Sequence, residues 1–283
     1  MNKNFIFSVS ILMFFSFNLS SQTTINLKVF LEGPFETTEM NTLLNASDSI
    51  PLLQPYHEAP WHYSVIEQVN SIPNENVVDW VLVEVLQPKV IDGDTSYALL
   101  ERKPAFLLKD GTITELDGSS MLTFPDLMVP EFHVKVIHRN HLPVISSSVL
   151  METGGVYSYD FTTDADKAIG GIHTQNEVVP GIWAMIAGDG NGDGQIDNRD
   201  KDEVWYHMQD SIGYYTADFN LDGIVNEDDL SLRWDVNSGK GVELPVNADR
   251  FMCGDTLVDY RNGMAYGTVE IDDQCWMTSY LSL

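Results

Sequence analysis

The amino-acid sequence predicts a mainly β protein, with an N-terminal antiparallel β-sandwich and a small α module of two loop–helix repeats. Short alternating or apolar stretches, separated by Pro and Gly, recur through residues 22–150 and are typical of a sandwich. Residues 189–200 and 218–229 repeat one acidic spacing, and the second copy starts 29 residues after the first. Hydrophobic residues make up 43% and aromatic residues 11% of the 283 positions, which is enough for a packed core.

The composition is strongly acidic. Asp and Glu number 42 against 15 Lys and Arg, which gives a formal net charge of −27. A general nucleic-acid binder needs a basic surface to displace counterions from phosphate, so nucleic acid is excluded as a partner. The same charge argues against docking on an anionic membrane. Two cysteines are too few for a disulfide-dense scaffold or a Cys-rich zinc module.

Residues 1–21 have the pattern of a secretory signal peptide. Lys3 supplies a positive start, residues 5–17 form an apolar run, and Ser20 and Ser21 are small residues near the expected cleavage site. A membrane anchor is the alternative, but the run is short for the roughly 20 residues of a spanning helix. We therefore expect a secreted or cell-surface protein with no membrane span after cleavage. Disulfides form outside the cell, and calcium is plentiful there.

Residues 22–150 are expected to form the β-sandwich. An Asp-Gly pair at 110–111 predicts a hairpin turn, because Gly accepts a positive φ. Phe132, Val134 and Val136 alternate, which places them on one face of a strand. The expected strands lie at 25–32, 77–86, 97–101, 105–108 and 132–138.

The rest of the chain divides by composition into four parts. Residues 151–180 are rich in Gly, Thr and Asp and predict a connecting segment with one or two short strands. Residues 181–238 form the acidic module, 239–250 a linker and 251–283 a tail module.

Both acidic repeats fit the calcium-loop spacing D-x-[DN]-x-[DN]-G-x5-[acid]. Ca²⁺ takes about 6–8 oxygen ligands, and Gly194 and Gly223 permit the sharp turn after position 5 of each loop. Position 7 supplies a backbone carbonyl, and position 12 closes the shell. The expected ligands of the first ion are Asp189, Asn191, Asp193, Gln195, Asp197 and Asp200. Those of the second ion are Asp218, Asn220, Asp222, Ile224, Asn226 and Asp229.

The charge of this region supports two bound Ca²⁺ ions. Residues 189–229 hold twelve acidic and two basic side chains. Without metal, the carboxylates of this region repel one another. The alternative is a solvated acidic turn cluster. The first loop offers four side-chain carboxylates and the second three, so we expect the first loop to bind more tightly. Ile196 and Val225 at position 8 predict a short bridge that pairs the two loops directly.

Helices are expected after each loop, at 201–209 and 230–236. A loop followed by a helix, repeated and with Asp at position 12, resembles the dockerin type I module over residues 189–237. The resemblance implies a cohesin-like protein partner. It also implies that loop positions 10 and 11 contact this partner, and these are Asn198, Arg199, Glu227 and Asp228.

Two further resemblances flank this module. Residues 28–35, 52–61, 78–85, 138–142 and 181–193 resemble a secreted Bacteroidetes-type hemagglutinin-like protein, which implies a surface or secreted location. The tail from Cys253 to Met277 resembles the opening of the Fibrobacter succinogenes major paralogous domain, cut short at the end of the chain. Cys253 and Cys275 are expected to form a disulfide, and two free thiols are the alternative.

No motif of an enzyme class stands out. His138 and His141 flank Arg139 and Asn140, and a hydrogen-bonded turn is favoured over a metal or catalytic pair. The sequence has no G-x-S-x-G, no H-E-x-x-H and no glycine-rich phosphate loop. We therefore predict a non-catalytic calcium-binding protein for adhesion or assembly, with a cohesin-like partner or a surface glycan. The alternatives are an accessory of polysaccharide degradation and, less favoured, a glycoside hydrolase.

Overall fold

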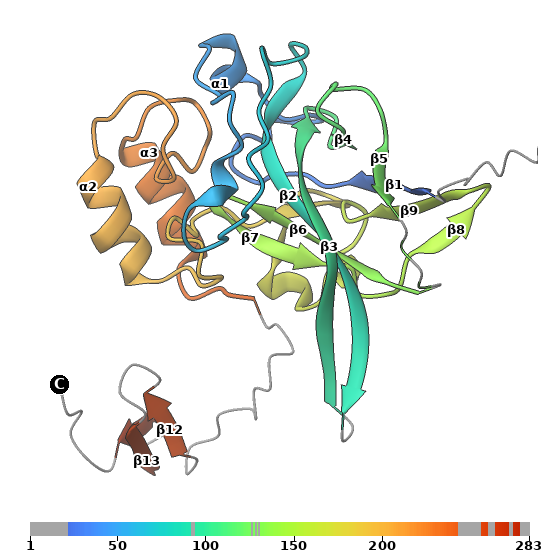
Figure 1. Ribbon diagram of the computed structural model, residues 1–283. Coiled ribbons are helices and arrows are strands. Elements are labelled where there is room, and N and C mark those ends of the chain that lie inside the picture. Colours follow the sequence, from blue (N-terminus) through green and yellow to red (C-terminus); the bar gives the residue numbers. More distant parts are fainter. Residues whose placement is uncertain are drawn as a thin grey trace, which may run out of the picture.

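The computed structural model describes residues 22–91, 94–125, 127, 129, 131–242, 256–259, 264–271 and 274–277. The fold is mainly β and its strand pairs are almost all antiparallel, which confirms this part of the prediction (Figure 1). The predicted signal peptide at 1–21 and most of the linker at 239–250 lie outside these residues.

Five strands form the larger sheet, in the order β4-β3-β2-β6-β7, and every neighbouring pair is antiparallel. They are β2 (Val77–Ile91), β3 (Asp94–Leu108), β4 (Ile113–Thr114), β6 (His133–His138) and β7 (His141–Ile145). β2 and β3 form one long hairpin, whose far end projects from the sheet (Figure 1). Val81 and Val83 on one face of β2, and Trp80 and Leu82 on the other, are fully buried, so both faces of this part of the strand are covered.

Four strands form the smaller sheet, in the order β5-β1-β9-β8. They are β1 (Gln22–Lys28), β5 (Leu122–Pro125), β8 (Met151–Thr153) and β9 (Val156–Asp160). β9 runs parallel to β1, so the segment after residue 150 extends the sheet that the N-terminal strand begins. Ile25 and Leu27 of β1 share one hydrophobic core with Val81 and Val134 of the larger sheet. Both sheets therefore bury apolar side chains in a common core.

A third, two-stranded sheet joins β10 (Gln175–Val179) and β11 (Ile182–Met185). β11 ends shortly before the first acidic loop, and Met185 forms a bridge with Leu31. The backbone of the first loop is therefore anchored to the segment that follows β1. Four short helices lie in the connections. They are α1 (Leu43–Ala46) and η1 (Pro55–His57) between β1 and β2, and η2 (Ala165–Lys167) and η3 (Gly171–His173) between β9 and β10.

A helical segment follows each acidic loop, and the two segments lie together on one side of the molecule (Figure 1). The first consists of η4 (Asp200–Trp205) and α2 (Tyr206–Met208). The second consists of α3 (Glu227–Asp229), η5 (Leu230–Trp234) and α4 (Asp235–Asn237). Their apolar side chains form a second core with Ile186, Ile196 and Phe219. No helix in the ranges described above is long and apolar enough to cross a membrane.

The two cores exchange side chains between the acidic module and the sheets. Leu142 of β7 packs in the core of the acidic module. In return, Leu221 of the second acidic loop packs in the core of the two sheets and is 1% exposed. The second loop is therefore built into the β structure rather than attached beside it.

The tail contains a three-stranded antiparallel sheet of β12 (Thr256–Asp259), β13 (Met264–Ile271) and β14 (Gln274–Met277). The predicted Cys253–Cys275 disulfide lies outside the described residues, because neither Cys253 nor the side chain of Cys275 is included.

Candidate metal centre

The two acidic loops share one set of internal hydrogen bonds. At position 1, Asp189 Oδ2 accepts from the Gly194 N–H at 3.1 Å, and Asp218 Oδ2 accepts from the Gly223 N–H at 2.9 Å. Gly194 has φ +84° and Gly223 has φ +85°, a region in which other L-residues are strained. The glycine at position 6 thus lets each loop curl back on its first carboxylate.

The position-12 carboxylate closes each loop. Asp200 accepts hydrogen bonds from the Asn191 N–H at 3.1 Å and the Asp197 N–H at 2.8 Å. In the second loop, Asp229 accepts from the corresponding N–H groups of Asn220 at 3.1 Å and Asn226 at 2.9 Å. Each closing Asp therefore ties positions 3 and 9 to the start of the following helical segment.

Positions 3 and 5 are linked in the same way in both loops. Asn191 Oδ1 accepts from the Asp193 N–H, and Asn220 Oδ1 accepts from the Asp222 N–H, both at 2.9 Å. The amide of each Asn donates to the carboxylate two residues later, at 3.1 Å in the first loop and 3.0 Å in the second. Two stretches that differ at many positions thus fold into one geometry.

Four carboxylates of these loops are buried. Asp200, Asp218 and Asp229 have no exposed surface, and Asp189 is 2% exposed. Burial raises the pKa of Asp200 and of Asp229 to about 6. Burial, followed by repulsion from Asp229, raises the pKa of Asp218 to about 7 although Arg139 opposes it. Burial and repulsion from Asp200 and Asp193 raise the pKa of Asp189 well above its usual value.

One carboxylate oxygen in the first loop has no partner. Asp189 Oδ1 is buried and accepts no hydrogen bond from the described part of the chain. A buried carboxylate without a partner is costly, and a cation beside it would offset that cost. The donor set of both loops is oxygen alone, which fits a hard cation such as Ca²⁺. In their present positions, no three His, Cys, Asp or Glu side chains among the described residues converge on a common metal position.

The prediction that Ile196 and Val225 pair the two loops directly is wrong. The Ile196 N–H donates to Lys240 O, and Ile196 O accepts from the Gly239 N–H, each at 2.8 Å. The Val225 N–H donates to Ser211 O, and Val225 O accepts from the Asp210 N–H, each at 2.9 Å. Both backbone groups of each position-8 residue are thus used elsewhere. Each loop pairs with the segment that follows the other loop's helical segment, while both position-8 side chains remain buried in one core.

Two tryptophans cross-link the loops instead. Trp205 Nε1 donates to Asn226 O in the second loop at 3.1 Å. Trp234 Nε1 donates to Asp197 O in the first loop at 2.9 Å. Both tryptophans stand 16 residues after the first Asp of their own loop. In both cases the acceptor is the backbone carbonyl at position 9 of the other loop. The cross-link is therefore reciprocal, which gives the module an approximate two-fold symmetry.

The side chains expected to contact a protein partner lie on the surface. Asn198, Arg199, Glu227 and Asp228 are all exposed. Arg199 also turns back on its own loop, where its guanidinium pairs with Asp193 at 2.6 Å and Asp197 at 3.2 Å. The second loop has no corresponding cation, because Asp228 occupies the position of Arg199.

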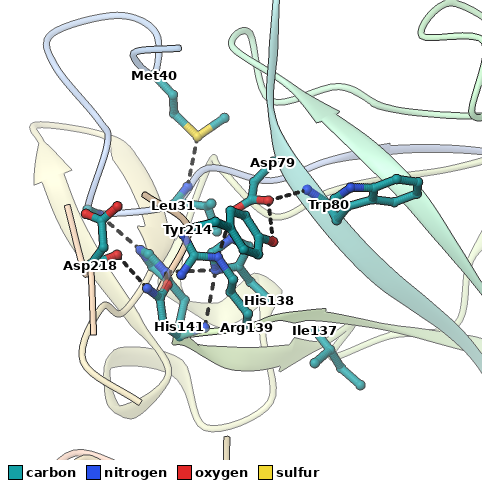
Figure 2. Close-up of polar contacts among 12 residues, drawn as sticks. Leu31, Met40, Asp79, Trp80, Ile137, His138, Arg139, His141, Tyr214 and Asp218 are labelled. Atoms are coloured by element: carbon teal, nitrogen blue, oxygen red, sulfur yellow. Dashed lines mark hydrogen bonds and ion pairs between the residues drawn. The ribbon is translucent and has the colours of Figure 1, made fainter. Parts of the chain in front are cut away.

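The turn between β6 and β7 links the larger sheet to the second loop (Figure 2). Asn140 Nδ2 donates to Asp218 O at 2.6 Å, and Arg139 donates to Tyr215 O. His141 Nε2 accepts from the Gly33 N–H at 3.1 Å. Residues 138–141 thus form the hydrogen-bonded turn that the sequence favoured.

Asp79 is the centre of this buried network (Figure 2). Its carboxylate accepts from Arg139 Nε at 3.0 Å, His138 Nε2 at 3.1 Å and Tyr214 Oη at 2.8 Å. Burial raises the pKa of Asp79, but Arg139 and His138 outweigh it and hold the pKa below its usual value. Burial lowers the pKa of both His138 and His141, which favours the neutral form of each imidazole.

Sequence reasoning did not find this network. Asp79 lies in an apolar strand 59 residues before His138, and only the folded sheet brings them together. The signal available in the sequence was the run of four polar residues at 138–141, which interrupts two apolar strands.

Comparisons of the chain with protein-family models, with curated proteins and with solved structures found no match.

Proposed function

We propose that this chain is a secreted or cell-surface, non-catalytic protein that binds two calcium ions and serves adhesion or assembly. The observation that carries the proposal is the pair of loops with equivalent hydrogen bonds and buried carboxylates of raised pKa. A divalent cation in each loop would replace the repulsion between these carboxylates with attraction.

Calcium fits these loops better than a softer metal. The side chains at positions 1, 3, 5, 9 and 12 are Asp or Asn in both loops, and position 7 offers a backbone carbonyl. Zinc and copper sites use His or Cys, and neither residue occurs at these positions. The first ion would be held by Asp189, Asn191, Asp193, Gln195, Asp197 and Asp200, and the second by Asp218, Asn220, Asp222, Ile224, Asn226 and Asp229.

The proposed role of calcium is structural. The ions would hold two dockerin-like loop–helix repeats against a β-sandwich formed by the two larger sheets, and would present Asn198, Arg199, Glu227 and Asp228 to a partner. Their exposure supports this assignment. The partner would be a cohesin-like protein or a surface glycan, and a role as an accessory of polysaccharide degradation is the alternative.

Calcium titration of the chain without residues 1–21 tests the proposal. We expect two binding events by calorimetry. Asp189→Asn should remove one event and Asp218→Asn the other, because each substitution removes a carboxylate at position 1. Asp160→Asn, which changes an acidic residue outside both loops, is the matched control and should keep both events. Unchanged binding in both loop variants would contradict the assignment.

A further inference from the structure

A pocket of about 240 Å³ lies between the first acidic loop and the larger sheet. Glu84 of β2, Arg102 of β3 and Lys135 of β6 line it from the sheet. Trp61, which follows η1, and Gly192 of the first loop line it from the other segments. The pocket thus combines charged side chains on a rigid sheet with one large aromatic ring.

The three charged side chains form a row across adjacent strands. Glu84 stands directly opposite Arg102 on one side and Lys135 on the other. Glu84 Oε1 lies 3.8 Å from Arg102 Nη1, and Glu84 Oε2 lies 3.8 Å from Lys135 Nζ. These distances are too long for hydrogen bonds. The side chains of Glu84 and Lys135 make no hydrogen bond to any described residue, although they are only 13% and 20% exposed.

The aromatic wall is held in place from two sides. Arg102 Nη1 donates to Trp61 O at 3.1 Å, and the Trp61 ring meets the Tyr56 ring edge to face at 5.2 Å. The first loop approaches closely, because a Cβ added at Gly192 would lie 2.9 Å from the Trp61 ring. The pocket is therefore preformed, which limits the entropy lost when a ligand binds.

We propose that this pocket binds a neutral pyranose unit, such as the end of a glycan chain. Sugar hydroxyls both donate and accept hydrogen bonds, and the row from Arg102 through Glu84 to Lys135 alternates donor, acceptor and donor. The apolar face of a pyranose ring packs on an aromatic ring such as that of Trp61. This inference rests on the proposed adhesion function and names its partner as a glycan.

Other ligand classes fit less well. Glu84 stands between the two cations and offsets part of their charge, and the chain has a net charge of −27, so an anionic ligand gains little. The lining contains a second carboxylate, that of Asp189. A purely apolar ligand would bury this charged row without hydrogen bonds, which is costly. Of the two carboxylates, Asp189 is assigned to calcium, which leaves Glu84 alone and without the second carboxylate that sugar hydrolysis needs.

Saturation-transfer NMR with methyl hexopyranosides and a neutral oligosaccharide array, both with calcium present, tests the proposal on the chain without residues 1–21. We expect binding of at least one hexopyranoside. Trp61→Ala and Glu84→Gln should each weaken it at least tenfold. Tyr206→Ala and Glu39→Gln remove an exposed ring and an exposed carboxylate away from the pocket, and should leave binding unchanged. Thermal melts establish that each variant is folded.

Several results would overturn the pocket assignment. These are no transfer to any hexopyranoside, equal binding by the two pocket variants and the wild type, or a preference for uronic acids over neutral sugars. Release of a new reducing end would also contradict it, because it would indicate turnover. Calorimetric calcium titration of the same sample separates the two proposals. Two intact calcium events with no sugar binding would reject the pocket alone, whereas absent calcium events would reject the proposed function.

Discussion

The two acidic loops have the same twelve-residue spacing and share most of their internal hydrogen bonds, but their surroundings differ. The second loop is wedged into the β structure. Asn140 donates a hydrogen bond to the backbone carbonyl of Asp218, and Leu221 packs in the core of the sheets. A Cβ added at Gly33 would lie 1.8 Å from Phe219 O. The first loop meets Pro60 and Trp61 at Gly192, beside the pocket.

The two loops therefore differ in charge and in preorganisation, both of which would affect the proposed calcium affinity. Counting carboxylates favours the first loop, with four against three. Arg199, however, pairs with two of the four, whereas no described cation forms an ion pair with the second loop, where Arg139 acts only by lowering the pKa of Asp218. The second loop is also fixed by contacts from the sheet, which lowers the cost of ordering it around an ion. We therefore expect the second loop to govern the stability of the whole fold and the first loop to act more locally.

The largest expected effect is a difference between Asp189→Asn and Asp218→Asn. With calcium at about 100 times its dissociation constant, loss of a site coupled to global unfolding costs about 2.7 kcal/mol. Asp218→Asn should lower the free energy of unfolding of the sheets by about this amount. Asp189→Asn should lower it by less than about 1 kcal/mol, because opening of the first loop can occur locally. Urea denaturation followed by hydrogen exchange of the β2 and β6 amides measures both.

Calcium-free samples supply the control for this pair. Without metal, each Asn relieves repulsion between buried carboxylates, so neither variant should be less stable than the wild type in chelator. Equal losses for both variants in the presence of calcium would show that the two loops are coupled to the sheets to the same degree.

The next effect comes from the contact between the sheets and the second loop. Gly33→Ala should cost about 2 kcal/mol, because a methyl group cannot fit against the backbone carbonyl of Phe219. It should also weaken the second calcium event and leave the first unchanged. Thermal melts and calorimetry measure the two effects. Gly154→Ala is the control, since a Cβ there meets nothing within 4 Å and only its φ of +63° is strained. Loss of the first event instead would contradict the contact as described.

The sequence predicted local patterns well and long-range contacts poorly. The mainly β structure was predictable from β-branched, partly alternating stretches such as 77–86, because this pattern depends only on residues that are neighbours in the chain. The spacing of the acidic loops is also local. The pairing of Ile196 with residues 239–240, rather than with the second loop, depends on where the second helical segment ends in space. The network of Asp79 and the row of Glu84 depend in the same way on strand register, which one sequence does not specify.

The third effect concerns pH and has opposite signs with and without calcium. The pKa values of about 6 for Asp200 and Asp229 and about 7 for Asp218 exceed the unfolded value of 3.8. The calcium-free fold therefore binds protons more tightly than the unfolded chain, and it loses stability as pH rises from about 4 to about 7. Calcium competes with these protons, so its affinity rises over the same range.

Melting curves at several pH values, with and without calcium, test these opposite pH dependences. In chelator, we expect the melting temperature to fall by several degrees between pH 5 and pH 8, because these carboxylates lose their protons over that range. With calcium it should rise or stay level. High salt screens surface repulsion but acts weakly on buried groups, so it serves as the control. A fall of the same size with calcium present would indicate that surface charge, not the loops, causes the pH dependence.

The smallest effect tests the reciprocal tryptophans, and its direction is the informative part. Trp205→Phe and Trp234→Phe each remove one hydrogen bond to the opposite loop, worth about 1 kcal/mol. Because Trp234 contacts Asp197, its substitution should weaken the first calcium event, although Trp234 follows the second loop in the chain. Trp205→Phe should weaken the second event. Trp183→Phe is the matched control, since its indole N–H donates to no described residue. If each tryptophan affected its own loop instead, the crossed arrangement would not govern calcium binding.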